Sequence, residues 1–195
     1  KSNLEKIKSQ IGVECKIHEG IFPNKGNWSN LYNEYSLFYP LLKKDDLRAH
    51  GCFLSHVTLL EKILDDDTDY ALILEDNIDI LRRIPHKIIV PKDFDILSLE
   101  EDRLGGIYYN SSLIRVTNGC GACGYIVNVK SIHNILDKLK GTELPIDLAY
   151  IELSYKNLLK MYNFRVSYVK RSEDINTIRE FYKRVVLMGI VGKGA

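Results

Sequence analysis

The chain has 195 residues, 45% of them hydrophobic, which suits one domain with a substantial buried core. Lysine and arginine total 27 against 26 aspartate and glutamate, so the net charge is only +1. Such a balance argues against a nucleic acid held by bulk electrostatics. No signal peptide is visible and the apolar run Val185 to Val191 is too short to span a bilayer, so we expect a soluble, cytoplasmic protein.

The first half of the chain predicts helices and strands in alternation. Residues 1–10 form an exposed helix, Val13 to Ile17 alternate as a strand does, and Gly20 to Pro40 predict a long irregular loop. Residues Asp46 through Leu64 have an apolar face at helical spacing and predict a helix, which is followed by a strand at Ala71 to Leu74. This alternation favours an α/β domain.

The second half predicts three further strands and two helices. Asp95 to Leu99 forms a short strand, and Leu113 to Val116 and Gly124 to Val129 flank a glycine-rich loop as a hairpin would. Helices begin near Ser131 and Asp147. The hairpin interrupts the parallel rhythm, so the expected fold class is α/β with a mixed central sheet flanked by helices.

We expect a single domain over residues 1–195. The run Val185 to Val191 has no obvious partner, which leaves open that the domain is cut from a longer polypeptide. The loop Gly119 to Gly124 holds a CxxC pair, but no second pair or nearby histidine completes a familiar zinc pattern. Reduced thiols are therefore expected.

An abrupt change from aliphatic to acidic residues marks the most informative stretch. Ala71 to Leu74 is a continuous apolar run, which suits a strand covered on both faces in a parallel sheet. Four polar residues follow it: Glu75, Asp76, Asn77 and Asp79. Oxygen donors beyond the carboxyl end of a strand are placed to hold a hard cation or a sugar hydroxyl, although an exposed acidic turn is the simpler alternative.

The segments GCFLSHVTLLEKIL and DYALILEDNIDI resemble the signature of glycosyltransferase family 25. The residues that carry the resemblance are Gly51, Cys52, Ser55, His56, Leu74, Glu75 and Asp76. The resemblance implies a GT-A fold, a UDP-sugar donor, a Mn²⁺ or Mg²⁺ ion, and transfer of galactose or glucose with inversion. It also implies a glycan or glycoprotein acceptor, and donor contacts from Ser55, His56, Glu75 and Asp76.

One position departs from the family pattern, because Asn77 stands where the family has a second aspartate. A neutral amide oxygen binds a divalent cation less strongly than a carboxylate does. Asp79 could supply the second carboxylate in a shifted cluster, so we predict Asp76, Asn77 and Asp79 as the metal ligands. Weak metal dependence is the alternative.

The predicted catalytic residues are Asp147 and Glu101. An inverting transfer needs a carboxylate that accepts the acceptor hydroxyl's proton, and the start of a helix facing a cleft suits that task. Asp147 could equally be a helix N-cap, and Glu100 and Asp102 compete with Glu101 because they follow the same strand.

Simpler interpretations of the donor residues stay open. His56 lies on an amphipathic helix, where a histidine is more often packed than chemical, and Ser55 could bond to its own backbone. Two other functions are also open: a degraded domain that binds sugars or acts in adhesion, which Asn77 favours, and a nucleotidyltransferase. The last would need a glycine-rich phosphate loop near the N-terminus, and none is visible.

Overall fold

The computed structural model describes residues 3–11, 15–24, 27–43, 46–85, 87–100, 104–172 and 185–190. Its helices are α1 (Asn3–Ile11), α2 (Trp28–Tyr35), α3 (Leu47–Ile63), α4 (Ile132–Leu139) and α5 (Ile146–Tyr155), with short 3-10 turns η1 (Pro40–Lys43) and η2 (Val129–Ser131). Its strands are β1 (Cys15–Glu19), β2 (Tyr70–Glu75), β3 (Ile78–Ile80), β4 (Ile96–Ser98), β5 (Leu104–Tyr108), β6 (Leu113–Gly119), β7 (Gly124–Asn128), β8 (Met161–Phe164), β9 (Val169–Arg171) and β10 (Val185–Ile190). No helix in the described part of the chain has the length and apolar character needed to cross a membrane.

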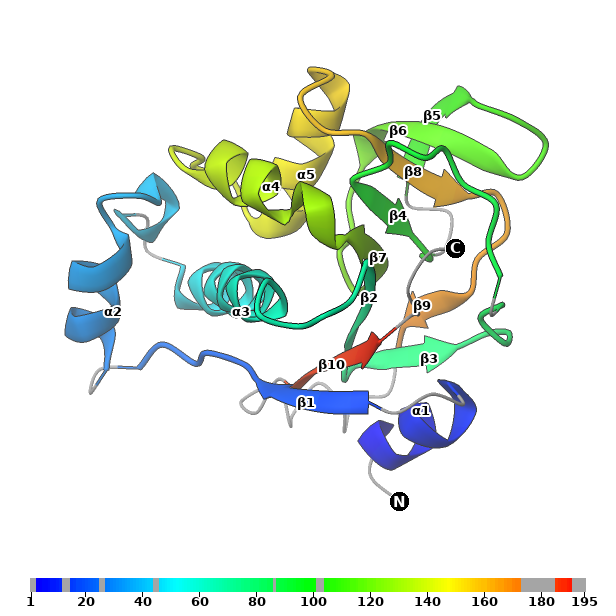
Figure 1. The fold of residues 1–195 in the computed structure, drawn as a ribbon. Helices are drawn as coiled ribbons and strands as arrows, with labels where there is room; N and C mark the ends of the chain where they lie inside the picture. Colours follow the sequence, from blue (N-terminus) through cyan, green and yellow to red (C-terminus); the bar gives the residue numbers. More distant parts are fainter. Residues whose placement is uncertain are drawn as a thin grey trace.

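Eight strands form the central sheet in the order β1-β10-β2-β7-β4-β8-β6-β5 (Figure 1). Every neighbouring pair is antiparallel except β4 and β8. A second sheet consists of β3 and β9. The expectation of an α/β domain with a mixed sheet and flanking helices is confirmed, although the sheet is mostly antiparallel.

The strand β2 is buried on both faces, as its apolar run predicts. Ala71 and Ile73 belong to the core that includes residues of α3, α4 and α5, whereas Leu72 and Leu74 belong to a second core on the opposite face, with Ile7 of α1. The expected parallel environment is wrong, because β10 and β7 both run antiparallel to β2. A continuous apolar run reports burial on two faces and not the direction of the neighbouring strands.

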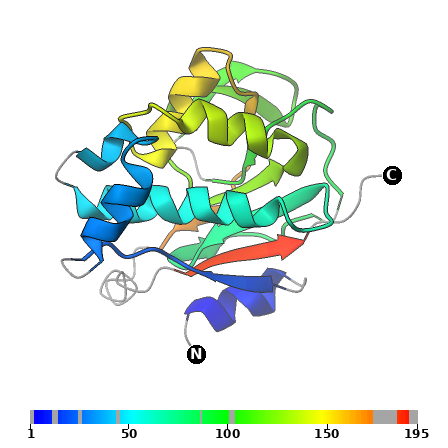
Figure 2. The same cartoon turned by 60° about the vertical axis from the view of Figure 1, so that its left-hand side comes forward.

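Helices cover the first face of the sheet, where α3 and α4 lie side by side (Figure 2). The helix α3 begins where predicted, since the Asp46 carboxylate accepts hydrogen bonds from the backbone N–H groups of Arg48 and Ala49. On the other face, α1 buries Ile7 and Ile11 against the second core. The N-terminal helix is therefore packed, and not wholly exposed as expected.

Three other expectations are wrong. The segment Gly20 to Pro40 is not all loop, because α2 lies within it. The strands β6 and β7 do not form a hairpin, since β8 and β4 lie between them in the sheet. The run at β10 does have partners, because it pairs with β1 and β2.

The strands β2, β4 and β8 point in the same direction, and their carboxyl ends share one edge of the sheet. This follows because β7 is antiparallel to both β2 and β4, while β4 is parallel to β8. The start of β7 lies at the same edge, where the Cys123 carbonyl accepts from the Glu75 N–H and the Gly124 carbonyl accepts from the Leu99 N–H. Glu75 at the end of β2 and Glu100 after β4 therefore lie at this edge of the sheet.

Candidate active site

A small pocket that is partly open to solvent lies at this edge of the sheet. Its residues come from the end of β4, the loop before β7, the first turn of α5 and the end of β9. They are Glu100, Cys120, Gly121, Cys123, Asp147, Lys170 and Arg171. Two carboxylates and two basic side chains thus line one concave surface, which makes it a candidate site for a polar, charged ligand.

Glu100 is built into the wall of the pocket and is only 5% exposed. Its Oε1 accepts hydrogen bonds from the backbone N–H groups of Cys123 and Gly124, at 2.5 and 3.4 Å. Gly121 packs on the same carboxylate with a φ of +140°, and a Cβ there would clash with Glu100 Oε2. The glycine is therefore required by both the backbone conformation and the space.

Burial raises the pKa of Glu100 to about 7, and the negative charge of Glu75 contributes to the shift. The hydrogen bonds from Cys123 and Gly124 act in the opposite direction, because they stabilise the charged form. A carboxyl group with this pKa exchanges protons readily near neutral pH, which is the property expected of a general acid or base.

The variant Glu100→Gln should be more stable than the unaltered protein at pH 8 but not at pH 4. The neutral carboxyl contributes stability that is present in full below the ordinary value of 4.5 and is lost as pH rises through about 7. Glutamine stays neutral throughout and keeps an acceptor oxygen, so the difference in unfolding free energy reaches about 3 kcal/mol at pH 8. Urea unfolding at both pH values measures it, and an equal difference at the two values would contradict the raised pKa.

Asp147 lies in the first turn of α5, and its side chain lines the pocket. The N-cap of this helix is Pro145, and no side chain forms a capping hydrogen bond. The interpretation of Asp147 as an N-cap is therefore wrong. Its carboxylate is free of that role and lies where the helix dipole favours a negative charge. The other predicted catalytic residue, Glu101, lies outside the described residues, as does Asp102.

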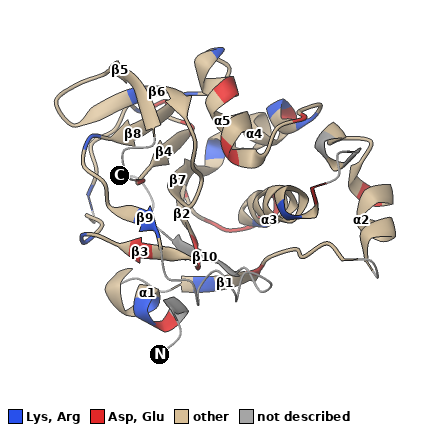
Figure 3. Ribbon diagram, turned by 180° about the vertical axis from the view of Figure 1, so that it is seen from behind, with Lys and Arg blue, Asp and Glu red and all other residues tan. Residues whose placement is uncertain are grey.

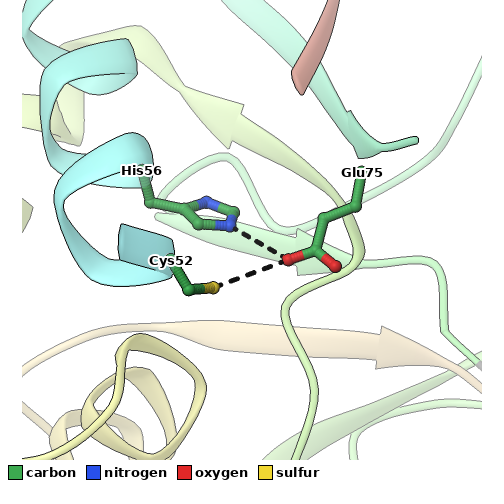
Figure 4. A group of neighbouring side chains, drawn as sticks. All are labelled: Cys52, His56 and Glu75. Atoms are coloured by element: carbon green, nitrogen blue, oxygen red, sulfur yellow. Dashed lines mark hydrogen bonds and ion pairs between the residues drawn. The ribbon is translucent and has the colours of Figure 1, made fainter. Parts of the chain in front are cut away.

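A polar cluster of Cys52, His56 and Glu75 lies between α3 and the end of β2 (Figure 4). Cys52 and His56 project from α3 toward Glu75 at the end of β2, which is 3% exposed. The Cys52 Sγ donates to Glu75 Oε1 at 3.7 Å, and His56 Nε2 lies 3.5 Å from the same oxygen. The other oxygen, Oε2, lies 3.6 Å from Arg171 Nη2, so Glu75 connects the cluster to the pocket.

Hydrogen bonds fix the orientation of His56 and Ser55. His56 Nδ1 lies 2.8 Å from the Tyr125 hydroxyl, whose ring also stacks on the imidazole. The Ser55 hydroxyl donates to the Gly51 carbonyl at 2.6 Å and accepts from the Ile21 N–H at 2.7 Å. Ser55 is thus bonded to its own helix and to the segment after β1, as the simpler interpretation held. The structure places His56 beside Glu75 but places neither Ser55 nor His56 in the lining of the pocket.

The predicted metal ligands Asp76, Asn77 and Asp79 follow Glu75 directly. Asp76 and Asn77 form the turn between β2 and β3, where Asp76 is half-buried and Asn77 is 4% exposed. Asn77 Oδ1 is buried and has no hydrogen-bond partner among the described residues, so it is an oxygen that a cation would satisfy. Asp79 lies on β3 and pairs with Lys6 of α1 at 3.2 Å, so the structure does not show it turned toward the other two.

Sequence analysis missed the two cations of the pocket. Lys170 and Arg171 lie on β9, where Figure 3 shows basic residues beside the acidic position on β3. Burial alone would lower the pKa of Arg171, but the negative charge of Glu75, with a further contribution from Glu100, outweighs it and raises the pKa. No local signal marks these residues, because a short basic strand end resembles any exposed surface strand.

Glu75 ends β2 and Glu100 follows β4, two strands that point the same way with β7 between them, and a pocket of mixed charge opens at Glu100; this architecture is that of an α/β domain with a candidate site for a polar ligand at the strand ends. Residues 4–103, which are 100 of the 195, match the sequence profile of glycosyltransferase family 25, described as LPS biosynthesis protein. The chain belongs to this glycosyltransferase family, and the predicted family is confirmed. The matched region includes α3, β2 and Glu100 but not Asp147, Lys170 or Arg171. No curated protein matches the chain.

Proposed function

We propose that the chain transfers a hexose, galactose or glucose, from a UDP-sugar to a hydroxyl of a glycan or glycoprotein. Family membership supports the transfer of a sugar. The observation that supports the rest is the pocket, which Asp147, Glu100, Lys170 and Arg171 line together. The proposal includes a GT-A fold and inversion at the anomeric carbon, which the family resemblance implies, and a cytoplasmic location.

Lys170 and Arg171 would bind the diphosphate of the donor. Arg171 offers a planar fork of N–H groups that matches phosphate oxygens, and Lys170 adds a second positive charge. Glu75 holds the Arg171 side chain from behind at 3.6 Å, which reduces the entropy lost when the donor binds. These contacts become stronger as negative charge grows on the departing diphosphate.

Asp147 would take the proton from the acceptor hydroxyl. A base in an inverting transfer must reach the nucleophile on the side opposite the leaving diphosphate, and Asp147 comes from a different element than the two cations. Glu100 competes for this role, because it lies in the same pocket and has a pKa of about 7. Glu101 was the other predicted base and stays a prediction.

A divalent cation, Mn²⁺ or Mg²⁺, would be held by Asp76 and Asn77. The half-buried carboxylate and the buried amide oxygen without a hydrogen-bond partner among the described residues are the hard oxygen donors that such ions prefer. Asp79 would join them only by giving up Lys6, an exposed ion pair that contributes little. When bound, the ion neutralises charge on the diphosphate.

A donor screen tests this proposal without any knowledge of the acceptor. Purified protein is incubated with UDP-galactose, UDP-glucose and other UDP-sugars, with and without Mn²⁺, and free UDP is measured. We expect slow hydrolysis of one UDP-hexose that Mn²⁺ increases. No UDP release from any donor under either condition would contradict the proposal.

The alternative is a domain that has lost catalysis and binds sugars or acts in adhesion. Asn77 favours it, because an amide replaces the charged ligand that a metal site would be expected to have. Calorimetry separates the two functions: a transferase binds UDP with an affinity that Mn²⁺ increases, whereas a degraded site shows no metal-linked nucleotide binding.

A further inference from the structure

Among the described residues, one group of histidine, cysteine and acidic side chains could hold a metal ion. It consists of Cys52, His56 and Glu75, whose ligand atoms all lie within 4.8 Å of one another. These are a sulfur, a nitrogen and an oxygen, and not the oxygen-only set that Mn²⁺ or Mg²⁺ prefers. We propose that Cys52, His56 and Glu75 form a zinc site that is separate from the proposed cation site of the sugar donor.

The distances around Glu75 Oε1 fit a tetrahedral zinc ion. Bonds of about 2.3 Å to sulfur, 2.05 Å to nitrogen and 2.1 Å to oxygen give tetrahedral edges of about 3.6 Å between sulfur and oxygen and about 3.4 Å between nitrogen and oxygen. The structure has 3.7 Å from Cys52 Sγ and 3.5 Å from His56 Nε2 to that oxygen. An ion can therefore enter with little movement of these two pairs.

The imidazole of His56 is oriented as a metal ligand. The side chain is 1% exposed, and its Nε2 is buried without a hydrogen-bond partner among the described residues. When Nδ1 carries the proton, it donates to the Tyr125 hydroxyl, as the other nitrogen of a zinc-bound histidine commonly does to an outer partner. The lone pair of Nε2 then faces Glu75 Oε1, and two acceptors face one another until a cation lies between them.

The charges of the cluster also suit zinc. The Cys52 thiol loses its proton when the ion binds, so thiolate and carboxylate together balance the two positive charges of zinc and keep the buried complex neutral. Cys52 is half-buried, whereas His56 and Glu75 are buried, so entry is on the cysteine side. Three protein ligands leave the fourth tetrahedral position for water or another small ligand.

Competition with a chromophoric chelator tests this site on tag-free protein, with zinc alone and no nucleotide. We expect one zinc per chain, with an affinity that excess Mg²⁺ or Mn²⁺ does not reduce. Cys52→Ser and His56→Gln should each weaken it about 100-fold or more, since even outer partners of zinc ligands contribute 10–100-fold. Cys120→Ser, which changes an exposed thiol of the pocket, is the matched control and should leave zinc affinity unchanged.

Cobalt substitution and thiol labelling keep the test decisive if a variant fails to fold. In the unaltered protein, Co²⁺ should give the charge-transfer band of a thiolate ligand, and zinc should protect Cys52 from alkylation. Zinc affinity unchanged in Cys52→Ser, no thiolate band, or no protection of Cys52 would each overturn the site. None of these measurements depends on UDP or on transfer, so the site and the proposed function can fail separately.

Discussion

Replacing Asp147 by asparagine is expected to lower kcat by about 10²–10⁴-fold while UDP affinity changes little. Asparagine has nearly the same shape but cannot accept a proton, and general base catalysis contributes about this factor. The half-buried carboxylate lies in the first turn of α5 without a capping role, so the substitution removes no structural hydrogen bond of the helix end. Steady-state transfer rates and calorimetry with UDP measure the two quantities.

The matched control for Asp147 is Glu152→Gln on the same helix. Glu152 pairs with Lys156 at 2.6 Å on the exposed side of α5 and lies outside the pocket, so kcat should be unchanged. Full activity of Asp147→Asn would contradict its role as the base. Loss of activity in Glu100→Gln, together with a pH profile that no longer changes near 7, would then assign the base to Glu100.

Replacing Arg171 by alanine is expected to weaken UDP binding by about 10- to 100-fold. A hydrogen bond to a charged group contributes about 1.5–3 kcal/mol to binding. The guanidinium of Arg171 can donate two parallel hydrogen bonds to phosphate oxygens in addition to its charge. Arg171→Lys keeps the charge but not the fork, so an intermediate loss is expected. Calorimetry with UDP and Mn²⁺ gives these affinities directly.

A control separates the loss of diphosphate contacts from a general effect of charge. Lys16 on β1 forms an ion pair with Asp66, which follows α3, and Lys16 does not line the pocket. The variant Lys16→Ala therefore removes one positive charge outside the pocket. Its UDP affinity should equal that of the unaltered protein. Thermal unfolding checks that Arg171→Ala stays folded, because Glu75 loses its cation in that variant. Equal UDP affinity in folded Arg171→Ala would exclude Arg171 from the donor site.

Local patterns in the sequence predicted the elements that carry the family signature. The start of the helix at Asp46, the apolar face of α3 and the apolar run of β2 are each encoded by neighbouring residues, and the structure has them where expected. The change from aliphatic to acidic residues after Leu74 and again after Leu99 also marked the ends of two strands, and the structure places the ends of β2 and β4 at one edge of the sheet.

Strand pairing could not be predicted in the same way. An apolar run such as β2 suits any strand with two covered faces, so it does not distinguish antiparallel from parallel neighbours. The glycine-rich loop before β7 resembled a hairpin turn, yet β4 and β8 lie between its flanking strands. Pairing over long separations depends on the whole sheet and leaves little trace in any one segment.

The charge partners of the site depended on the same long-range contacts. Asp79 looked available as a metal ligand, but Lys6, 73 residues earlier, lies beside it. Arg171 and Lys170 join Glu100 and Asp147 in the pocket only because β9 lies beside the ends of β2 and β4, where Val169 bridges to Glu100. Residue types alone therefore predicted candidate acids but not their partners.

A crystal structure of the protein with UDP and Mn²⁺ tests the central claim most directly. We predict that the diphosphate contacts Lys170 and Arg171 and that the ion is bound by Asp76 and Asn77. Asp147 should then lie on the side of the pocket where the sugar of the donor would bind. A nucleotide bound at another edge of the sheet, with these side chains turned away from it, would contradict the account.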